Sequence, residues 1–316
     1  EKDAPIAVHL HRFRQHLNES FATELPAFDS WRDAFEALSD AIEANRPHRI
    51  AVFLDELPWM ATRRSGLLQA IDYYWNTRLS RQRHLCMVLC GSAASWMLDK
   101  LINAKGGLYN RLTGRIHLQP FDLATTRAFL AHRKVRLKPK QILELYMALG
   151  GVPYHLLAVA AGKSAAQNVS SICFDRDGVL SNEYDRLLTS LFDDAESHDA
   201  LVRAIAKRRS GVALKDLRAM PGLPSGGRLT ARLGELEAAG FIAQLVPYGR
   251  RARDSWYRIV DEYLWFYFSW IDKRSKHPAR SDAASYWQAK STTPAYRSWA
   301  GYAFETICLK HATQIR

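Results

Sequence analysis

A short apolar run followed by two acidic residues constrains the fold of the first part of the chain most strongly. The run is Ile-Ala-Val-Phe-Leu at residues 50–54, and Asp55 and Glu56 follow it directly. Such a segment is typical of a central strand in a parallel sheet whose two faces are both covered. In open α/β sheets, ligands bind at the carboxyl ends of such strands. The two acids are therefore expected at a ligand site. The same pattern also fits a buried strand that ends in a solvated acidic turn.

Strands and helices alternate through the first part of the chain. A second apolar run at 85–90 is followed by Gly91 and Ser92, and a further strand is expected at 115–118. Between and around these strands, apolar residues recur at helical spacing in the segments 31–44, 66–79 and 95–102. This alternation predicts an α/β fold with a parallel sheet covered by helices on both faces. We expect this domain to cover residues 1–120.

Beyond the α/β region the expected strands stop and helices dominate. A helical lid is expected at 121–195. Three helices, at 199–208, 214–220 and 228–239, are then followed by short strands at 241–246 and 255–260. Three helices and a basic β-hairpin predict a winged helix-turn-helix at 196–272. We interpret residues 273–316 as a linker and the start of another domain. The aromatic residues between 256 and 270 are expected to pack in a core.

The positive charge of the chain is concentrated in this second half. Lys and Arg exceed Asp and Glu by 44 to 32, a net charge of +12, and the segment 200–280 alone holds 16 Lys and Arg against 7 Asp and Glu. Such a region suggests a nucleic-acid partner. In a winged helix the third helix enters the major groove, and the wing reaches phosphates or the minor groove. We therefore expect DNA contacts from Arg228, Thr230, Arg232, Arg250, Arg251 and Arg253. A solvated basic face and a protein-binding winged helix remain alternatives.

Several longer motifs occur along nearly the whole chain. They are Phe53-Leu-Asp-Glu-Leu-Pro-Trp-Met60, Cys90-Gly-Ser-Ala-Ala-Ser-Trp-Met97, Gly106-Gly-Leu-Tyr-Asn-Arg-Leu-Thr113, Gly150-Gly-Val-Pro-Tyr154, Gly162-Lys-Ser-Ala-Ala-Gln-Asn168 and Gly301-Tyr-Ala-Phe-Glu305. In this order they resemble the archaeal-type ATPases, a branch of the AAA+/STAND P-loop NTPases. The resemblance implies an incomplete P-loop NTPase-type sheet, followed by a helical lid and a winged helix-turn-helix.

The resemblance also assigns roles to single residues. Asp55 and Glu56 match the Walker B acids, so that Asp55 would hold Mg²⁺ through water and Glu56 would polarise the attacking water. Ser92 matches sensor 1, which reads the γ-phosphate or positions water. Arg111 and Arg115 lie where related enzymes keep Arg residues near a nucleotide, and one of them is a candidate arginine finger. Ordinary surface pairing is the alternative for both.

Two further positions follow from the resemblance in the second half of the chain. Gly151-Val-Pro153 matches the GxP turn of the lid, where Pro153 would contact the nucleotide; a simple helix start at the proline explains it equally well. Glu305 matches a metal-binding Glu in the first helix of a nuclease-like domain. The Asp and the Glu-x-Lys that would complete that metal site are missing from this chain, so it is not expected to cut DNA. An exposed helical Glu is the alternative.

The chain departs from the family in its phosphate-binding loop. A P-loop needs G-x-x-x-x-G-K-[ST] between a strand and a helix. Gly162-Lys163-Ser164 does not qualify, because Leu157 takes the place of the first Gly within an expected helix. The family carries its P-loop before the segment that begins here, so we interpret the chain as a fragment or a degenerate member. As a complete molecule it should bind ATP weakly or not at all, since nothing else replaces the backbone cradle and the Lys.

These observations favour an ATP- and Mg²⁺-dependent switch ATPase with a DNA-binding winged helix. The alternatives are a DNA-binding regulator without useful hydrolysis, or a nuclease whose catalytic domain lies beyond residue 316. No apolar stretch approaches the length of a membrane span, and residues 1–11 lack the core of a signal peptide. We expect a cytoplasmic protein without a membrane partner, and a homo-oligomer is possible. Its four cysteines are too few for a disulfide framework, and we expect Cys86 and Cys90 to be buried.

Overall fold

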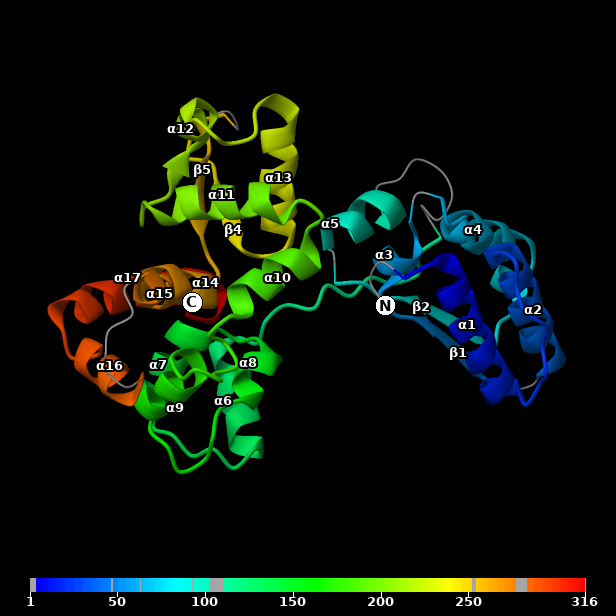
Figure 1. The fold of residues 1–316 in the computed structure, drawn as a ribbon, viewed down its shortest axis with the longest axis horizontal. Coiled ribbons are helices and arrows are strands. Elements are labelled where there is room, and N and C mark those ends of the chain that lie inside the picture. Colours follow the sequence, from blue (N-terminus) through cyan, green and yellow to red (C-terminus); the bar gives the residue numbers. More distant parts are fainter. Residues whose placement is uncertain are drawn as a thin grey trace. The chain divides into compact units, whose positions relative to one another are not determined.

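The structure, a computed structural model, describes residues 4–46, 48–62, 64–92, 94–102, 111–251, 254–276 and 283–315. The chain divides into two compact units, residues 1–115 and residues 116–316 (Figure 1). It is a mixed α/β protein, mostly helical, with a small parallel sheet in the first unit and a small antiparallel sheet in the second. No helix among these residues is long and apolar enough to span a bilayer.

The first unit packs helices against a two-stranded sheet. Its strands are β1 (Ile50–Leu54) and β2 (Leu85–Leu89), which run parallel. Its longer helices are α1 (Ile6–Phe21), α2 (Trp31–Ala44) and α4 (Leu67–Thr77), and its short ones are α3 (Leu57–Met60), η1 (Leu79–Arg81), α5 (Ala94–Met97) and the π-helical turn η2 (Leu98–Ile102). Ser30 caps α2, since its Oγ accepts the Asp33 N–H at 3.3 Å. The core of this unit includes Trp31, Phe35 and Leu38 from α2.

Among the described residues, one face of the parallel sheet has no helix packed against it, which differs from the expectation of helices on both faces. Along both strands, exposed residues alternate with half-buried ones, and Phe53 is 59% exposed. The register pairs Ala51 with Cys86 and Phe53 with Val88, so these four exposed side chains share one face. Cys86 is therefore exposed and Cys90 only half-buried, contrary to the prediction that both thiols are buried.

The strand expected at residues 115–118 does not form. This segment alternates polar and apolar residues, which is why its pattern predicts a strand. Ile116 and Leu118 are instead 87% and 85% exposed, and no strand within the described ranges pairs with them. Alternation alone does not make a strand, because the backbone groups need a partner ladder. The boundary between the two units falls in this exposed segment, after Arg115.

The second unit begins with helices. They are α6 (Leu123–His132), α7 (Pro139–Leu149), α8 (Pro153–Leu157), α9 (Ala165–Cys173) and α10 (Glu183–Leu191). Side chains fix two of their starts: Asp122 Oδ1 accepts the Thr125 N–H at 2.6 Å, and Ser164 forms a capping box with Gln167 at the start of α9. Because Leu157 ends α8 and Ser164 caps α9, the segment between them is a helix–helix connection. This agrees with rejecting Gly162-Lys163-Ser164 as a phosphate loop.

Three helices and a three-stranded antiparallel sheet follow α10. The helices are α11 (Ala195–Ala206), α12 (Leu214–Ala219) and α13 (Gly226–Ala238), and Figure 1 shows them around the strands β4 (Ile242–Leu245) and β5 (Trp256–Ile259). A third strand, β3 (Val212–Ala213), pairs with β5, which gives the order β3-β5-β4. Sequence periodicity could not predict β3 because it has only two residues. Gly240 ends the α13 turn with a φ of 76°, as its expected position at the helix C-terminus requires.

The chain continues through helices rich in aromatic residues. They are α14 (Glu262–Phe266), the π-helical turn η4 (Tyr267–Ile271), α15 (Asp272–Lys276), α16 (Ala283–Lys290), α17 (Pro294–Lys310) and α18 (Ala312–Ile315). Trp270, Trp287 and Trp299 are buried together, with ring centroids 5.6 Å apart for the first two and 6.1 Å apart for Trp270 and Trp299. The expected aromatic core is therefore confirmed for Tyr263, Phe266 and Trp270, whereas Trp256 is exposed.

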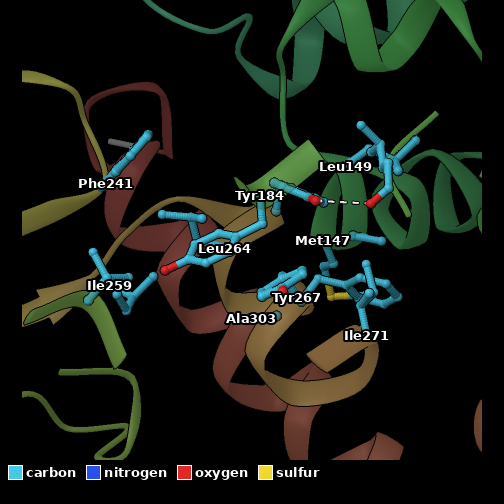
Figure 2. Packing of buried hydrophobic residues seen from close by; sticks show 14 of the residues in the cluster. Met147, Leu149, Tyr184, Phe241, Ile259, Leu264, Tyr267, Ile271 and Ala303 are labelled. Atoms are coloured by element: carbon cyan, nitrogen blue, oxygen red, sulfur yellow. Dashed lines mark hydrogen bonds between the residues drawn. The ribbon is translucent and has the colours of Figure 1, made fainter. Parts of the chain in front are cut away.

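A single core joins all parts of the second unit. Figure 2 shows Met147 and Leu149 of α7, Tyr184 of α10, Ile259 of β5, Leu264 of α14 and Ala303 of α17 in one packed cluster. Segments that are far apart in the sequence therefore bury their apolar side chains against each other, and this cooperativity stabilises them as one unit.

Candidate functional site

The carboxyl ends of β1 and β2 lie next to each other in the first unit. Leu54 pairs with Leu89 at the ends of the two strands. The backbone ladder continues beyond them, because the Cys90 N–H donates to the Leu54 carbonyl and the Leu57 N–H donates to the Cys90 carbonyl, both at 2.9 Å. The acidic pair after β1 and the Gly-Ser pair after β2 therefore leave the sheet side by side, as expected of parallel strands.

Glu56 and Ser92 meet at this edge of the sheet. One carboxylate oxygen of Glu56, Oε2, accepts the Ser92 hydroxyl at 2.9 Å and the Ser92 backbone N–H at 3.2 Å. Glu56 also has a left-handed φ of 48°, which is uncommon for a residue with a side chain and often marks a functional position. The Asp55 carboxylate accepts the Glu56 N–H at 3.0 Å, which supports this turn.

Cys90 and Gly91 belong to the same site, although only their motif pointed to them. Burial raises the pKa of the Cys90 thiol, and so do its hydrogen bond to Asp55 and the negative charges of Asp55 and Glu56. At Gly91 an added Cβ would lie 2.7 Å from Pro58 Cδ, which is closer than real Cβ contacts, so the α3 turn requires a glycine. In the sequence, Cys90 ends the predicted strand at 85–90 and Gly91 follows it directly, and both belong to the motif at 90–97.

The oxygen groups at the strand ends suit Mg²⁺. Asp55 is exposed on one side of its turn, and Glu56 and Ser92 supply a second carboxylate and a hydroxyl. Mg²⁺ in nucleotide sites is held by one or two carboxylates together with water and phosphate oxygens. Asp55, with its exposed carboxylate, fits this pattern as one such ligand. Across the ranges that the structure describes, no group of three or more His, Cys, Asp or Glu residues could hold a metal by itself.

Within the described ranges, no hydrogen bond or ion pair links the two predicted arginines to this site. Arg111 and Arg115 are both exposed, and neither forms a hydrogen bond or ion pair with another described residue. Residues 103–110, which include the start of the motif at 106–113, lie outside the described part of the chain. Both side chains have the exposure that contact with another molecule would need.

The predicted GxP turn lies in the second unit and has a structural reason for its glycine. The Phe121 N–H donates to the Gly151 carbonyl at 2.8 Å. A Cβ on Gly151 would lie 1.8 Å from the Phe121 carbonyl oxygen, so no other residue fits. Pro153 is the first residue of α8, which is the position that a helix start favours for proline. The local geometry thus explains both residues without a nucleotide, and a role in nucleotide contact stays a prediction.

A buried ion pair lies against this turn. Glu262 is 4% exposed, and both its oxygens accept from Lys310 Nζ, at 2.8 and 2.9 Å. A Cβ on Gly150 would lie 3.2 Å from Glu262 Oε2. Burial raises the pKa of Glu262, while the Lys310 ammonium opposes this rise. The end of α17 is thereby tied to the turn at 150–151.

The predicted DNA-contacting residues divide into exposed and paired groups. Arg228 and Thr230 on α13 and Arg250 and Arg251 in the β4–β5 connection are exposed. Arg232 is half-buried, and its guanidinium donates to Glu235 Oε2 at 2.8 Å and to Asp194 Oδ2 at 3.1 Å. These two carboxylates neutralise the charge of Arg232. Arg253 lies outside the described residues.

The partners of Arg232 also hold a buried histidine. His198 is fully buried, its Nε2 lies 2.7 Å from Glu235 Oε2, and its Nδ1 lies 2.7 Å from the Asp194 carbonyl. Its ring stacks on Phe192 at 3.9 Å. Both ring nitrogens therefore have a polar partner inside the protein. The network anchors α13 to the start of α11.

Glu305 is exposed on α17 and has no neighbouring group of metal ligands within the described ranges. The exposed-Glu alternative therefore accounts for what the structure shows of this residue. Its predicted part in a metal site would need ligands from elsewhere and stays a prediction.

The strand-end site lies in a segment that matches a known protein family. Residues 7–159 match the family described as an ATPase domain predominantly from Archaea. This segment contains Asp55, Glu56 and Ser92 as well as the turn at 151–153. The part of the chain most similar to an ATPase domain is therefore the part that holds the strand-end site. The antiparallel sheet and α17 lie outside this match.

Similar individual proteins come from archaea. An uncharacterized protein of Methanocaldococcus jannaschii is 23% identical over 266 residues, which are 83% of this chain and 56% of that protein. An uncharacterized ATP-binding protein of the same organism is 31% identical over 116 residues, which are 37% of this chain and 31% of that protein. The chain spans only about half and about a third of their lengths. A solved structure, the Walker-type ATPase of Pyrococcus abyssi, has a TM-score of 0.49 and 20% identity, and the match covers 79% of this chain and 73% of that chain.

Proposed function

We propose that this protein is an ATP-hydrolysing switch of the AAA+/STAND type, with the strand-end site of the first unit as its hydrolytic centre. The observation that carries the proposal is the double hydrogen bond from Ser92 to Glu56 Oε2. It joins the two positions at which an ATPase needs a water-polarising carboxylate and a phosphate-sensing hydroxyl. The match of residues 7–159 to an archaeal ATPase family supports this assignment.

Each residue of the site has a distinct part in this mechanism. Asp55 would hold a Mg²⁺ ion, which when bound supplies charge stabilisation to the phosphate oxygens. Glu56 would accept a hydrogen bond from the attacking water and orient it. Both hydrogen bonds from Ser92 go to Oε2 of Glu56, and a carboxylate can accept at both of its oxygens, so Glu56 would keep acceptor capacity for the water. Ser92 would hold the Glu56 side chain in place for this role.

The test is ATP binding and hydrolysis by the full-length protein and its Glu56→Gln variant. The substitution keeps the side-chain shape but weakens its action on the water, so kcat should fall roughly 100-fold or more, with ATP binding retained. Asp29→Asn is a matched control, because Asp29 is an exposed acid of the same unit. Full-length protein that fails to bind Mg²⁺-ATP, or a Glu56→Gln variant with unchanged kcat, would refute the proposal.

Arg111 and Arg115 extend the proposal to a second copy of the chain. Their exposure suits an arginine that acts on the nucleotide of a neighbouring subunit. Hydrolysis should then rise faster than linearly with protein concentration, and Arg111→Ala or Arg115→Ala should remove this rise without affecting ATP binding. A rate per subunit that is constant over all concentrations would contradict the role in a homo-oligomer.

We further propose that residues 196–272 form a winged helix that binds DNA. Three helices and an antiparallel hairpin support the fold, and exposed Arg228, Arg250 and Arg251 support the partner. Arg232, neutralised by two carboxylates, would anchor α13 instead of contacting DNA. A DNA-binding regulator without useful hydrolysis is the second candidate, and the same surface supports it.

Salt-dependent DNA binding tests the second proposal. Each phosphate-contacting Arg that is replaced by Ala should reduce the slope of log K against log salt by about 1. Arg176→Ala, which removes an exposed charge elsewhere in the unit, is the control. If Arg228→Ala, Arg250→Ala and Arg251→Ala all leave DNA binding unchanged, this surface does not bind DNA. If the protein has no ATPase activity and Glu56→Gln leaves DNA binding unchanged, the regulator is favoured.

A further inference from the structure

The outer end of the β4–β5 hairpin exposes apolar side chains in a protein region where most others are buried. Tyr248, at the tip, is 106% exposed, so its ring makes almost no contact with the rest of the chain. Leu245, Val246 and Trp256 behind it are also exposed. Isolated exposed apolar residues are ordinary, but several together mark an interaction surface. We call these four residues the hairpin patch.

The local backbone holds Tyr248 outward. The Arg250 N–H donates to the Pro247 carbonyl at 2.9 Å, which closes a four-residue turn. Gly249, the third residue of this turn, has a φ of 72°, and a positive φ at that position is typical of tight turns that need glycine. Tyr248 occupies the second position, where a side chain projects away from the turn. Behind it, Leu245 pairs with Trp256 across the strands, so both lie on one face of the hairpin.

Positive charge surrounds this apolar tip. Arg250 and Arg251 follow Tyr248 and are exposed. The nearby carboxylate of Asp254 accepts the backbone N–H of Arg251 at 3.3 Å, and within the described residues neither guanidinium forms an ion pair. An exposed aromatic ring beside unneutralised guanidinium groups complements a partner with flat apolar faces and a negative backbone. Nucleic acid with an accessible base has both properties.

We propose that Tyr248 is a base-stacking residue, and that the hairpin recognises DNA containing an unpaired or unstacked base. The phenol ring stacks on that base while Arg250 and Arg251 bind the flanking phosphates. A fully paired duplex offers no free base face without the cost of unstacking, whereas a bulge or a duplex–single-strand junction offers one already. The inference rests on the proposed DNA binding by this unit, and adds to it a preference for a class of DNA structure.

The experiment compares two DNAs of equal length and flanking sequence, one fully paired and one with a single unpaired base. Wild-type full-length protein should bind the second more tightly. Tyr248→Ala should weaken binding to the DNA with the unpaired base by roughly 5- to 150-fold, the range of aromatic stacking on one base, and should leave binding to the paired duplex nearly unchanged. Tyr248→Phe keeps the ring and should retain the preference, whereas Tyr248→Leu keeps only apolar area and should lose it.

Failure of this inference can be told apart from failure of the proposed DNA binding. Protein that binds the paired duplex but shows no preference overturns the stacking role alone. Protein that binds neither DNA overturns both. Equal weakening of both complexes by Tyr248→Ala also overturns the stacking role. If Tyr248→Ala instead loses self-association and binds both DNAs as before, the stacking role is overturned and the hairpin patch is assigned to a protein partner. Because Tyr248 is fully exposed, its variants should unfold at the temperature of the wild type.

Discussion

Replacing Lys310 by Met should destabilise the second unit through the carboxylate it leaves behind. Glu262 is nearly inaccessible to water and accepts both hydrogen bonds of Lys310. Met fills the same volume without a charge, so the variant buries an unpaired carboxylate next to Asp261. Removing one partner of a buried pair costs about 3–5 kcal/mol. We expect about 3 kcal/mol at pH 8, because Lys310 itself is partly exposed.

The loss should depend on pH in a defined direction. Burial raises the pKa of Glu262 above the 4.5 of a free Glu, and Lys310 opposes this rise. A carboxyl whose folded pKa is raised contributes stability that is complete below its unfolded pKa and is lost as pH rises through its folded pKa. Lys310→Met raises the folded pKa of Glu262 further, which widens the pH range between the unfolded and folded pKa values. Within the window, stability should fall by up to about 1.4 kcal/mol per pH unit.

Urea unfolding at several pH values between about 4.5 and 8 measures this effect. Lys310→Met should be close to the wild type at the acidic end and fall behind progressively towards pH 8. The double variant Glu262→Gln/Lys310→Met is the control, because it has no buried charge and should lose the added pH dependence. The reasoning fails if Lys310→Met has the same pH slope as the wild type, or if the double variant keeps the steep slope.

Three further predictions concern other sites. Gly91→Ala should destabilise the first unit by about 1–3 kcal/mol and abolish the proposed ATPase activity, because the new Cβ meets Pro58; urea unfolding that matches the wild type would contradict the packing at α3. His198→Gln should cost about 2–3 kcal/mol of unfolding free energy, and a loss below 0.5 kcal/mol, the ordinary range for surface changes, would show that the buried ring is dispensable. A thiol reagent should modify Cys86 rapidly and Cys173 only after unfolding, since burial raises the pKa of the Cys173 thiol; a fast phase that survives Cys86→Ser would oppose this.

Local sequence patterns predicted the elements of the fold well where packing agrees with them. Apolar residues at helical spacing placed α2, and an uninterrupted apolar run placed β1 next to its acidic pair. The placement of the acidic pair at a strand end followed from one general rule, that ligands bind at the carboxyl ends of parallel strands. The resemblance supplied Ser92, and the structure shows that Ser92 contacts Glu56. Such features can be predicted from the sequence because they are local or depend on one long-range pairing.

The features that were missed depend on long-range partners. Residues 115–118 alternate as a strand would, yet the ladder partner that would make them one is lacking among the described residues. Cys86 was expected inside because its strand is apolar, but burial depends on what covers the sheet. Arg232 has the spacing of a DNA-contacting residue, and only the fold brings Asp194 against it from the start of another helix.

The cluster of Trp270, Trp287 and Trp299 also gives the second unit an optical signature of its own. Indole rings at these separations and near-perpendicular orientations couple their electronic transitions, which should produce strong near-ultraviolet circular dichroism. Buried indoles also emit at shorter wavelengths than solvated ones. Because the three tryptophans come from η4, α16 and α17, their spectrum reports whether the C-terminal helices are docked. Undocking of these helices can therefore be followed without any added label, against the background of the six other tryptophans among the nine of the chain.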